Sequence, residues 1–340
     1  MPGDIRASQA SDGRTVTSRM LLQVARLAWQ MPFARAIAPR RPVTVLYHSV
    51  PAVEDGSGLS RTIFEQHILF LERHFDFVAL RDAHQKRGAR QRTQVLLTFD
   101  DGFRNNAEVV APLLRRLRIP AVFFVASRHA QPGKCLWFSY LRALERHFRW
   151  LGFHFRGEFF DMAATARRHS VSRLSKCLLG LSPHPTAMYQ AIEEELPPIE
   201  DFLSEVEIAT EYSGMTGEQV GELAADSLFS IGVHTMDHPF LTRCEPTEAR
   251  RQIEENRTWL ETVSGRRCDS IAYPSGDYSQ EVLDLCRSLA FTRGFAVANP
   301  IDRRSDLALS RIGIYAKSTD LLAFKVQWGH FMRNVRIPVG

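Results

Sequence analysis

The alternation of short apolar runs with helically spaced segments limits this chain to few folds. The apolar runs that predict strands are Val43–Tyr47, Val95–Thr98, Val122–Val125, Ser230–Val233, Ser270–Tyr273, Thr292–Val297 and Arg311–Tyr315. The segments with helical spacing are Phe64–Phe75, Asn106–Leu117, Gly217–Ala225, Thr247–Val263 and Gln280–Leu289. Strands that alternate with helices form βα units around a mostly parallel sheet. This many units favour closure of the sheet into a barrel or partial barrel.

The alternation stops between about residues 134 and 213, in a segment that is first aromatic and then helical and charged. We interpret this segment as a helical insertion in a βα loop, and insertions after barrel strands lie at the catalytic face. Its aromatic residues are Trp137, Phe138, Tyr140 and Trp150. They are expected to form the core of the insertion, and the alternative is that one or two of them line a binding wall.

The two ends of the chain are expected to lie outside the barrel, which spans residues 41–320. Residues 1–18 are polar and predicted to be disordered. Residues 19–37 have an amphipathic helical pattern, and two interpretations remain open: a helix packed on the domain, or a basic helix lying on the inner membrane. Residues 321–340 are expected to form a C-terminal extension.

Neither an export signal nor a membrane span is expected. Arg26 interrupts the apolar run that a signal peptide would need, and no stretch approaches the ~18 apolar residues of a spanning helix. The five cysteines are widely spaced without a C-x-x-C pair, which favours free thiols in a reducing compartment. We therefore expect a cytoplasmic protein or one peripheral to the inner membrane.

Net charge argues against a nucleic-acid partner. The formal charge is +5, and the basic residues are spread along the chain without a basic stripe or a nucleic-acid motif. Mild basicity of this kind fits small anionic partners only weakly.

Polar residues with catalytic potential follow the predicted strands. His48 follows the first strand, Asp100 and Asp101 follow the second, and "HTMDH" (residues 234–238) and "PSG" (residues 274–276) follow two later strands. The carboxyl ends of barrel strands share one face, so these residues can converge although they are far apart in sequence.

The adjacent carboxylates of Asp100 and Asp101 have two interpretations. They could form a polar turn that caps a helix, or a metal site in which one Asp is a ligand and the other a base. The histidines of "HTMDH" are spaced i and i+4, and two His with one carboxylate are a standard ligand set for Zn²⁺. The two motifs together favour the metal site.

The motifs "TFDDG" and "HTMDH" resemble those of the polysaccharide deacetylases of the NodB-homology type, carbohydrate esterase family 4. The family patterns are T-F-D-D-G and H-[ST]-x-x-H, in this order, and the resemblance covers roughly Val43 to Tyr315. It implies an α/β fold, a deformed (β/α) barrel, and metal-dependent removal of acetyl groups from sugars.

The resemblance also implies roles for individual residues. Asp101, His234 and His238 would be the metal ligands, with Zn²⁺ as the expected ion and Co²⁺ or Ni²⁺ as alternatives. Asp100 would be the general base that activates water. A cation on Asp101 would allow Asp100 to stay ionised beside it.

A third family motif aligns with "YPSG", in which the Ser275 backbone N–H becomes the candidate oxyanion donor. Tyr273 and Pro274 of this motif are expected on the substrate side. The family often has an Arg before the proline that pairs with the base, but Ala272 stands there. Arg311 is our candidate for this role, and we also count it among the candidate substrate-binding residues.

The general acid does not follow the common family pattern. The usual C-terminal Leu-x-x-His is not visible, and His330 lies in a poor context. "VLYHSV" resembles a Tyr-His segment of the poly-N-acetylglucosamine deacetylases, in which the acid motif is permuted to the front. We therefore predict that His48 protonates the leaving amine.

The resemblance implies a deacetylase that acts on an N-acetylated sugar, linked to a nucleotide, lipid or glycan, in bacterial surface-polysaccharide assembly such as lipopolysaccharide biosynthesis. Two alternatives remain open. One is a related amide hydrolase such as a sugar deformylase, and the other is a non-catalytic carbohydrate-binding barrel.

Overall fold

The structure is a computed structural model that describes residues 42–51, 59–83, 92–181, 183–297, 305–315 and 318–328. The predictions for residues 1–40, including the amphipathic segment 19–37, and for His330 lie outside these residues. Among the described helices, none is long and apolar enough to cross a membrane.

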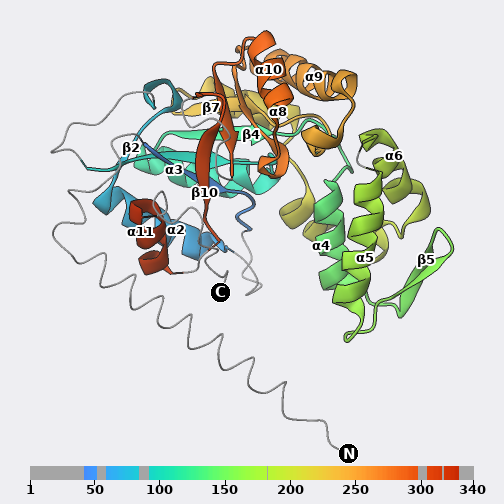
Figure 1. Ribbon diagram of the computed structural model, residues 1–340. Coiled ribbons are helices and arrows are strands. Elements are labelled where there is room, and N and C mark those ends of the chain that lie inside the picture. The colour runs from blue at the N-terminus through green and yellow to red at the C-terminus, as the bar shows by residue number, and fades with distance from the viewer. Residues whose placement is uncertain are drawn as a thin grey trace, which may run out of the picture.

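A closed barrel of parallel strands forms the centre of the molecule, which confirms the predicted fold class (Figure 1). Seven strands close the ring within the described residues, in the order β1-β10-β9-β8-β7-β4-β3, and β3 pairs back onto β1. Their bounds are β1 Val43–Tyr47, β3 Gln94–Phe99, β4 Ala121–Val125, β7 Phe229–Val233, β8 Ser270–Ala272, β9 Arg293–Ala296 and β10 Leu309–Gly313. The short strand β2 (Asp76–Phe77) extends the sheet beside β3.

The barrel strands read as apolar runs because they are covered on both sides. All five residues of β1 and of β4 are buried, as expected where helices cover a parallel sheet. The last strand differs from its prediction: β10 starts and ends two residues earlier. Its first residues, Leu309 and Ser310, pair with β9 although Ser310 is polar. Arg311 therefore lies inside the strand and Tyr315 beyond its end.

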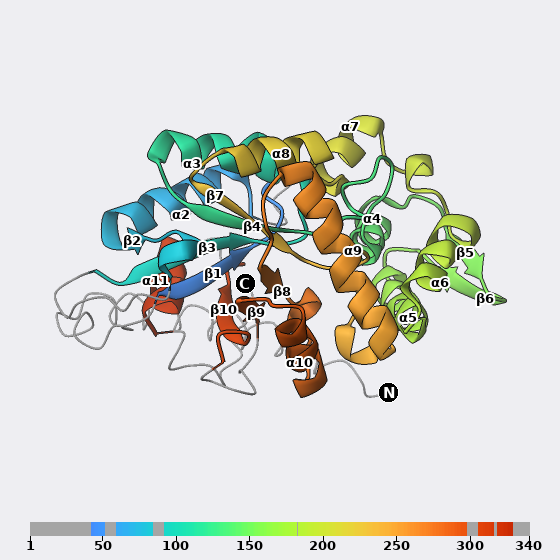
Figure 2. The same cartoon turned by 90° about the horizontal axis from the view of Figure 1, so that it is seen from above.

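Helices surround the barrel (Figures 1 and 2). Their bounds are α2 Arg61–His74, α3 Ala111–Leu117, α8 Gly217–Ala225, α9 Pro246–Ser264, α10 Gln280–Ser288 and α11 Thr319–Trp328. A π-helical turn, η3 (Asn106–Val110), precedes α3, and the 3-10 turns are η2 Leu80–Asp82, η7 Leu241–Arg243 and η8 Pro274–Gly276.

Local sequence signals fix several helix ends. The Ser60 hydroxyl accepts a hydrogen bond from the Ile63 N–H at the start of α2, and Thr216 and Gln219 form a reciprocal capping box on α8. Gly265, with φ at +62°, ends α9. The predicted extension 321–340 begins inside α11, whose Leu322 and Val326 join the barrel core.

The insertion between β4 and β7 forms a separate lobe that projects to one side of the barrel in both views (Figures 1 and 2). It contains an antiparallel hairpin that the sequence analysis did not predict, in addition to its helices. Its elements are α4 Trp137–His147, β5 Gly152–Phe155, β6 Glu158–Asp161, α5 Arg167–Gly180, α6 Pro185–Gln190, η4 Ala191–Glu195, η5 Ile199–Asp201, α7 Glu205–Glu207 and η6 Ile208–Tyr212.

The insertion has a hydrophobic core of its own. Trp137 and Tyr140 are buried in it, and Phe138 is half-buried and packs against it. Trp150 instead has 50% of its surface exposed, so it is not a core residue.

Candidate metal centre

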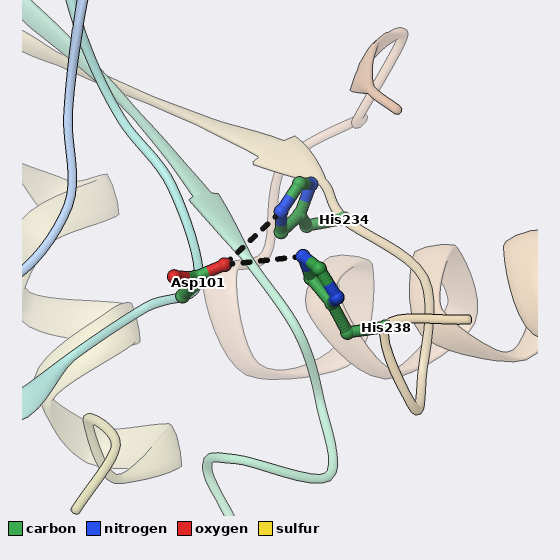
Figure 3. A group of neighbouring side chains, drawn as sticks. All are labelled: Asp101, His234 and His238. Atoms are coloured by element: carbon green, nitrogen blue, oxygen red, sulfur yellow. Dashed lines mark ion pairs between the residues drawn. The ribbon is translucent and has the colours of Figure 1, made fainter. Parts of the chain in front are cut away.

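Three predicted ligands come together at the carboxyl ends of β3 and β7 (Figure 3). Asp101 Oδ1 lies 3.2 Å from His234 Nε2 and 3.4 Å from His238 Nε2. The ligand atoms of the three side chains all lie within 4.8 Å of one another, and each residue is buried. The two motifs, far apart in sequence, therefore form one cluster.

The composition of this cluster fits a divalent cation. Both carboxylate oxygens of Asp101 and Nε2 of His234 are buried without a hydrogen-bond partner, an arrangement that is unfavourable unless another group satisfies them. One carboxylate and two imidazoles are a common zinc ligand set with room for further ligands. Asp101, His234 and His238 would hold the ion.

The loops that carry the ligands adopt unusual backbone conformations. Asp101, Thr235 and His238 have φ values of +74°, +64° and +53°, a region that non-glycine residues rarely adopt. Gly102 also has a positive φ, and a Cβ there would lie 2.6 Å from a Val125 methyl. Backbone strain of this kind clusters at functional sites.

Surrounding hydrogen bonds fix the ring of His234 and the backbone of His238. His234 Nδ1 lies 2.8 Å from the Ala272 carbonyl oxygen, so the proton on Nδ1 leaves Nε2 free to bind a cation. The Asn256 side chain accepts from the His234 backbone N–H and donates to the Val125 carbonyl. The backbone N–H of His238 donates to the Thr235 hydroxyl.

Asp100 is bound to Arg311, the predicted replacement for the family Arg. Two guanidinium nitrogens of Arg311 donate to the two carboxylate oxygens, each at 2.6 Å, and both side chains are buried. Burial alone would raise the pKa of Asp100, but the positive charge of Arg311 and its hydrogen bonds outweigh this effect and lower the pKa. The carboxylate is therefore ionised at neutral pH.

The electrostatics of the ligands also favour the ionised carboxylate. Burial opposes ionisation of Asp101, but the neighbouring imidazoles of His234, His48 and His238 hold its pKa well below the usual range. Burial lowers the pKa of His238 to about 4, so its imidazole is neutral and can donate a lone pair at neutral pH.

His48, which follows β1, lies at the same face. A proton on its ring would help to lower the pKa of both Asp100 and Asp101, because the ring lies within electrostatic reach of the two carboxylates. The Asn106 side-chain amide donates to the His48 carbonyl at 2.9 Å. The His48 ring stacks on Tyr315, with centroids 6.0 Å apart.

The "YPSG" residues form the turn η8. Ser275 is exposed and has a φ of +55°. Tyr273 has no exposed surface, and its hydroxyl donates to the Leu307 carbonyl. Pro274 is buried, and the Arg311 side chain is occupied by Asp100. Tyr273 and Arg311 are thus buried and hydrogen-bonded within the protein, and their contact with a substrate stays a prediction.

Several residues that hold the ligand loops were not predicted from the sequence. His129 has one ring nitrogen near the Asp101 carbonyl and the other near the Tyr212 carbonyl, at 3.2 and 2.9 Å. Asp237, inside "HTMDH", accepts a hydrogen bond from Gln252 and lies 3.5 Å from Arg128. The position of Asp237 within the motif was a signal for its role, whereas His129 carried none.

Known proteins share this fold and part of this sequence. The sequence profile of the polysaccharide deacetylase family matches residues 87–146 and 187–294. The unmatched residues between the two segments contain β5, β6 and α5 of the insertion. No curated protein matches the chain.

Two solved structures illustrate the shared fold. Streptococcus pyogenes deacetylase PplD, solved in complex with acetate, is 15% identical with a TM-score of 0.52, over 82% of this chain and 93% of that chain. IcaB from Ammonifex degensii is 18% identical with a TM-score of 0.53, over 85% of this chain and 98% of that chain. These similarities show a common barrel, and the profile match adds the motif-bearing segments. The chain therefore belongs to the polysaccharide deacetylase family.

Proposed function

We propose that this protein hydrolyses the N-acetyl group of an N-acetylated sugar with the help of a divalent metal ion. Zn²⁺ is the expected ion. The observation that carries the proposal is the buried cluster of Asp101, His234 and His238 beside an ionised Asp100. A binding barrel has no need of an ionised base next to a carboxylate ligand. The family description supports the acetylated carbohydrate as substrate.

Each residue has a role in this reaction. The ion, when bound, polarises the acetyl carbonyl and lowers the pKa of water. Asp100 accepts the proton of the attacking water while Arg311 holds its carboxylate in place. The water oxygen bonds to the carbonyl carbon, the C–N bond breaks, and His48 gives a proton to the amine nitrogen that leaves. The Ser275 N–H stabilises the charge on the carbonyl oxygen.

As substrate, we propose an N-acetylated sugar that is linked to a nucleotide, lipid or glycan and takes part in bacterial surface-polysaccharide assembly. We also propose that residues 41–320 form the catalytic unit. Residues 19–37 have two interpretations, a helix packed on this unit, which we prefer, or a basic helix on the inner membrane. Loss of the protein from the membrane fraction on deletion of residues 1–40 would favour the membrane helix, and an unchanged distribution would refute it.

The first experiment combines elemental analysis with acetate release. We expect about one zinc-like ion per chain in the wild type, its loss in His234→Ala/His238→Ala, and acetate release from N-acetylated saccharides that is lost in the same variant. A matched control is His154→Ala/His169→Ala, which removes two exposed histidines of the insertion and should change neither.

Three results would decide against this assignment. Failure of the wild type to bind an ion after addition of Zn²⁺ or Co²⁺ would refute the metal centre. Release of formate alone from formylated sugars would assign a deformylase. A metal-loaded protein that binds saccharides without hydrolysis would be a binding barrel.

A further inference from the structure

Tyr315 is an aromatic residue at the catalytic face that the reaction above does not use. It lies just past the carboxyl end of β10, on the strand that also carries Arg311. Its side chain is 48% exposed, although the residues before it in β10 are buried or half-buried. An accessible aromatic ring beside a buried polar centre is a feature of ligand sites.

The surroundings of Tyr315 connect it to the candidate general acid and to the carboxylates. Its ring stacks on His48 at an interplanar angle of 22°, a favourable offset arrangement. Partial burial, together with the negative charges of Asp100 and Asp101, raises the pKa of the Tyr315 phenol. The ring therefore lies between solvent and the reacting groups.

Gly313 makes room for this position. A Cβ on Gly313 would lie 2.6 Å from Cε2 of Tyr315, so the ring folds back over a residue that has no side chain. The intervening Ile314 N–H donates to the Leu46 carbonyl at 2.9 Å and ties the backbone to β1. The placement of the ring thus depends on a specific residue two positions earlier.

A second aromatic ring lies on the other side of the ligand cluster. Phe138, at the start of α4, contacts the His238 ring edge to face, with centroids 4.8 Å apart. In the ring of strands, β3 lies between β1 and β4, and β10 and β7 lie beyond these two. The Tyr315–His48 pair and the Phe138–His238 pair therefore flank the carboxylates that follow β3.

We propose that Tyr315 is a specificity-determining residue whose ring packs on the apolar C–H face of the pyranose that carries the N-acetyl group. This contact would keep the nitrogen of that sugar next to His48 while the carbonyl lies over the ligand cluster. The proposal rests on the proposed function, because it assigns the sugar to that same site.

The test uses the zinc-loaded full chain and a tetramer of N-acetylglucosamine, with acetate release as the measure of turnover. Tyr315→Ala should raise KM about 10-fold, equivalent to about 1.4 kcal/mol, and leave the zinc content unchanged. Tyr315→Phe should stay close to the wild type because it keeps the ring. Gly313→Ala should also raise KM because its methyl group displaces the ring.

The matched control is Phe159→Ala, which removes a ring of the same exposure, 49%, from the hairpin of the insertion. It should not change KM. A KM in both Tyr315→Ala and Gly313→Ala that equals the KM of this control would overturn the proposal.

Calorimetric binding of the same tetramer to the zinc-loaded protein distinguishes failure of the proposed function from failure of the Tyr315 contact. If the wild type binds the tetramer without releasing acetate, the reaction is refuted, and weaker binding by Tyr315→Ala still supports the contact. Equal binding by the wild type and Tyr315→Ala, or no binding by the wild type, overturns it.

Discussion

At the scale of single residues, the pair of Asp100 and Arg311 shows how position in space replaces position in sequence. The family pattern expects an Arg just before the proline, and this chain has Ala272 there. The guanidinium instead comes from the middle of β10, and its carbon lies 5.5 and 5.9 Å from the ring centroids of Phe124 and Phe295. These apolar surroundings strengthen the attraction between Asp100 and Arg311. They also make it costly to bury either charge without its partner.

Arg311→Met should therefore both destabilise and inactivate the protein. The change leaves the buried Asp100 carboxylate without its partner, and we expect a loss of about 3–5 kcal/mol in the free energy of unfolding. Urea unfolding measures this quantity. The double variant Asp100→Asn/Arg311→Met should be more stable than Arg311→Met, because no charge remains buried alone. Equal losses in both variants would show that the ion pair has no such role.

Sequence patterns were sufficient to propose Asp100, Asp101, His234 and His238 as one site. These residues directly follow predicted strands, and the carboxyl ends of parallel barrel strands share one face. Sequence patterns were insufficient for His129 and Tyr315. Those two act through contacts between distant segments, His129 with Tyr212 and Tyr315 with His48, and no local pattern encodes such contacts.

At the scale of elements, the insertion is fastened to the loop that carries His238. The Trp137 indole N–H lies 3.4 Å from the His238 carbonyl oxygen, and the Tyr189 hydroxyl donates to the Asp237 carbonyl at 2.9 Å. Arg128 lies over the Tyr189 ring, with its guanidinium carbon 3.8 Å from the centroid. The composition predicted an insertion, but the hairpin β5–β6 was missed because its exposed residues lack a clear alternation.

Tyr189→Phe should weaken metal binding. The change removes one hydrogen bond to the ligand loop, worth about 1 kcal/mol, so zinc affinity should fall about fivefold in a competitive chelator titration. Tyr140→Phe is the matched control, because its hydroxyl donates to the Pro197 carbonyl within the same insertion. An equal effect of both substitutions on zinc affinity would mean that the insertion acts only through general stability.

At the scale of the whole molecule, closure of the barrel depends on β1, which pairs with both β3 and β10. Helix α2 packs over this junction, where the Tyr47 hydroxyl lies 3.3 Å from Nδ1 of the fully buried His67. The Nε2 atom of His67 has no hydrogen-bond partner. Protonation of this ring would therefore place an unpaired charge in the core.

Stability should fall in acid partly because of His67. Burial lowers its pKa to about 4, against an ordinary value of 6.5, so the unfolded chain binds the proton more readily between these values. The neutral His67 ring contributes about 3 kcal/mol to the free energy of unfolding. This contribution is complete above pH 6.5 and is lost as the pH falls towards 4. Urea unfolding with a chelator present should show a shallower pH dependence for His67→Gln. Parallel curves for the two proteins would contradict this.

The separate core of the insertion has an evolutionary consequence. Its hydrophobic core is separate from the barrel core, and it is attached to the loop of His238 by the Phe138–His238 and Trp137–Phe240 ring contacts and by hydrogen bonds from Trp137 and Tyr189 to backbone carbonyls. A backbone carbonyl can accept such a hydrogen bond whatever side chain its residue carries. A descendant lineage could therefore exchange the outer part of the lobe while keeping Phe138, Trp137 and Tyr189, and with them the reaction centre.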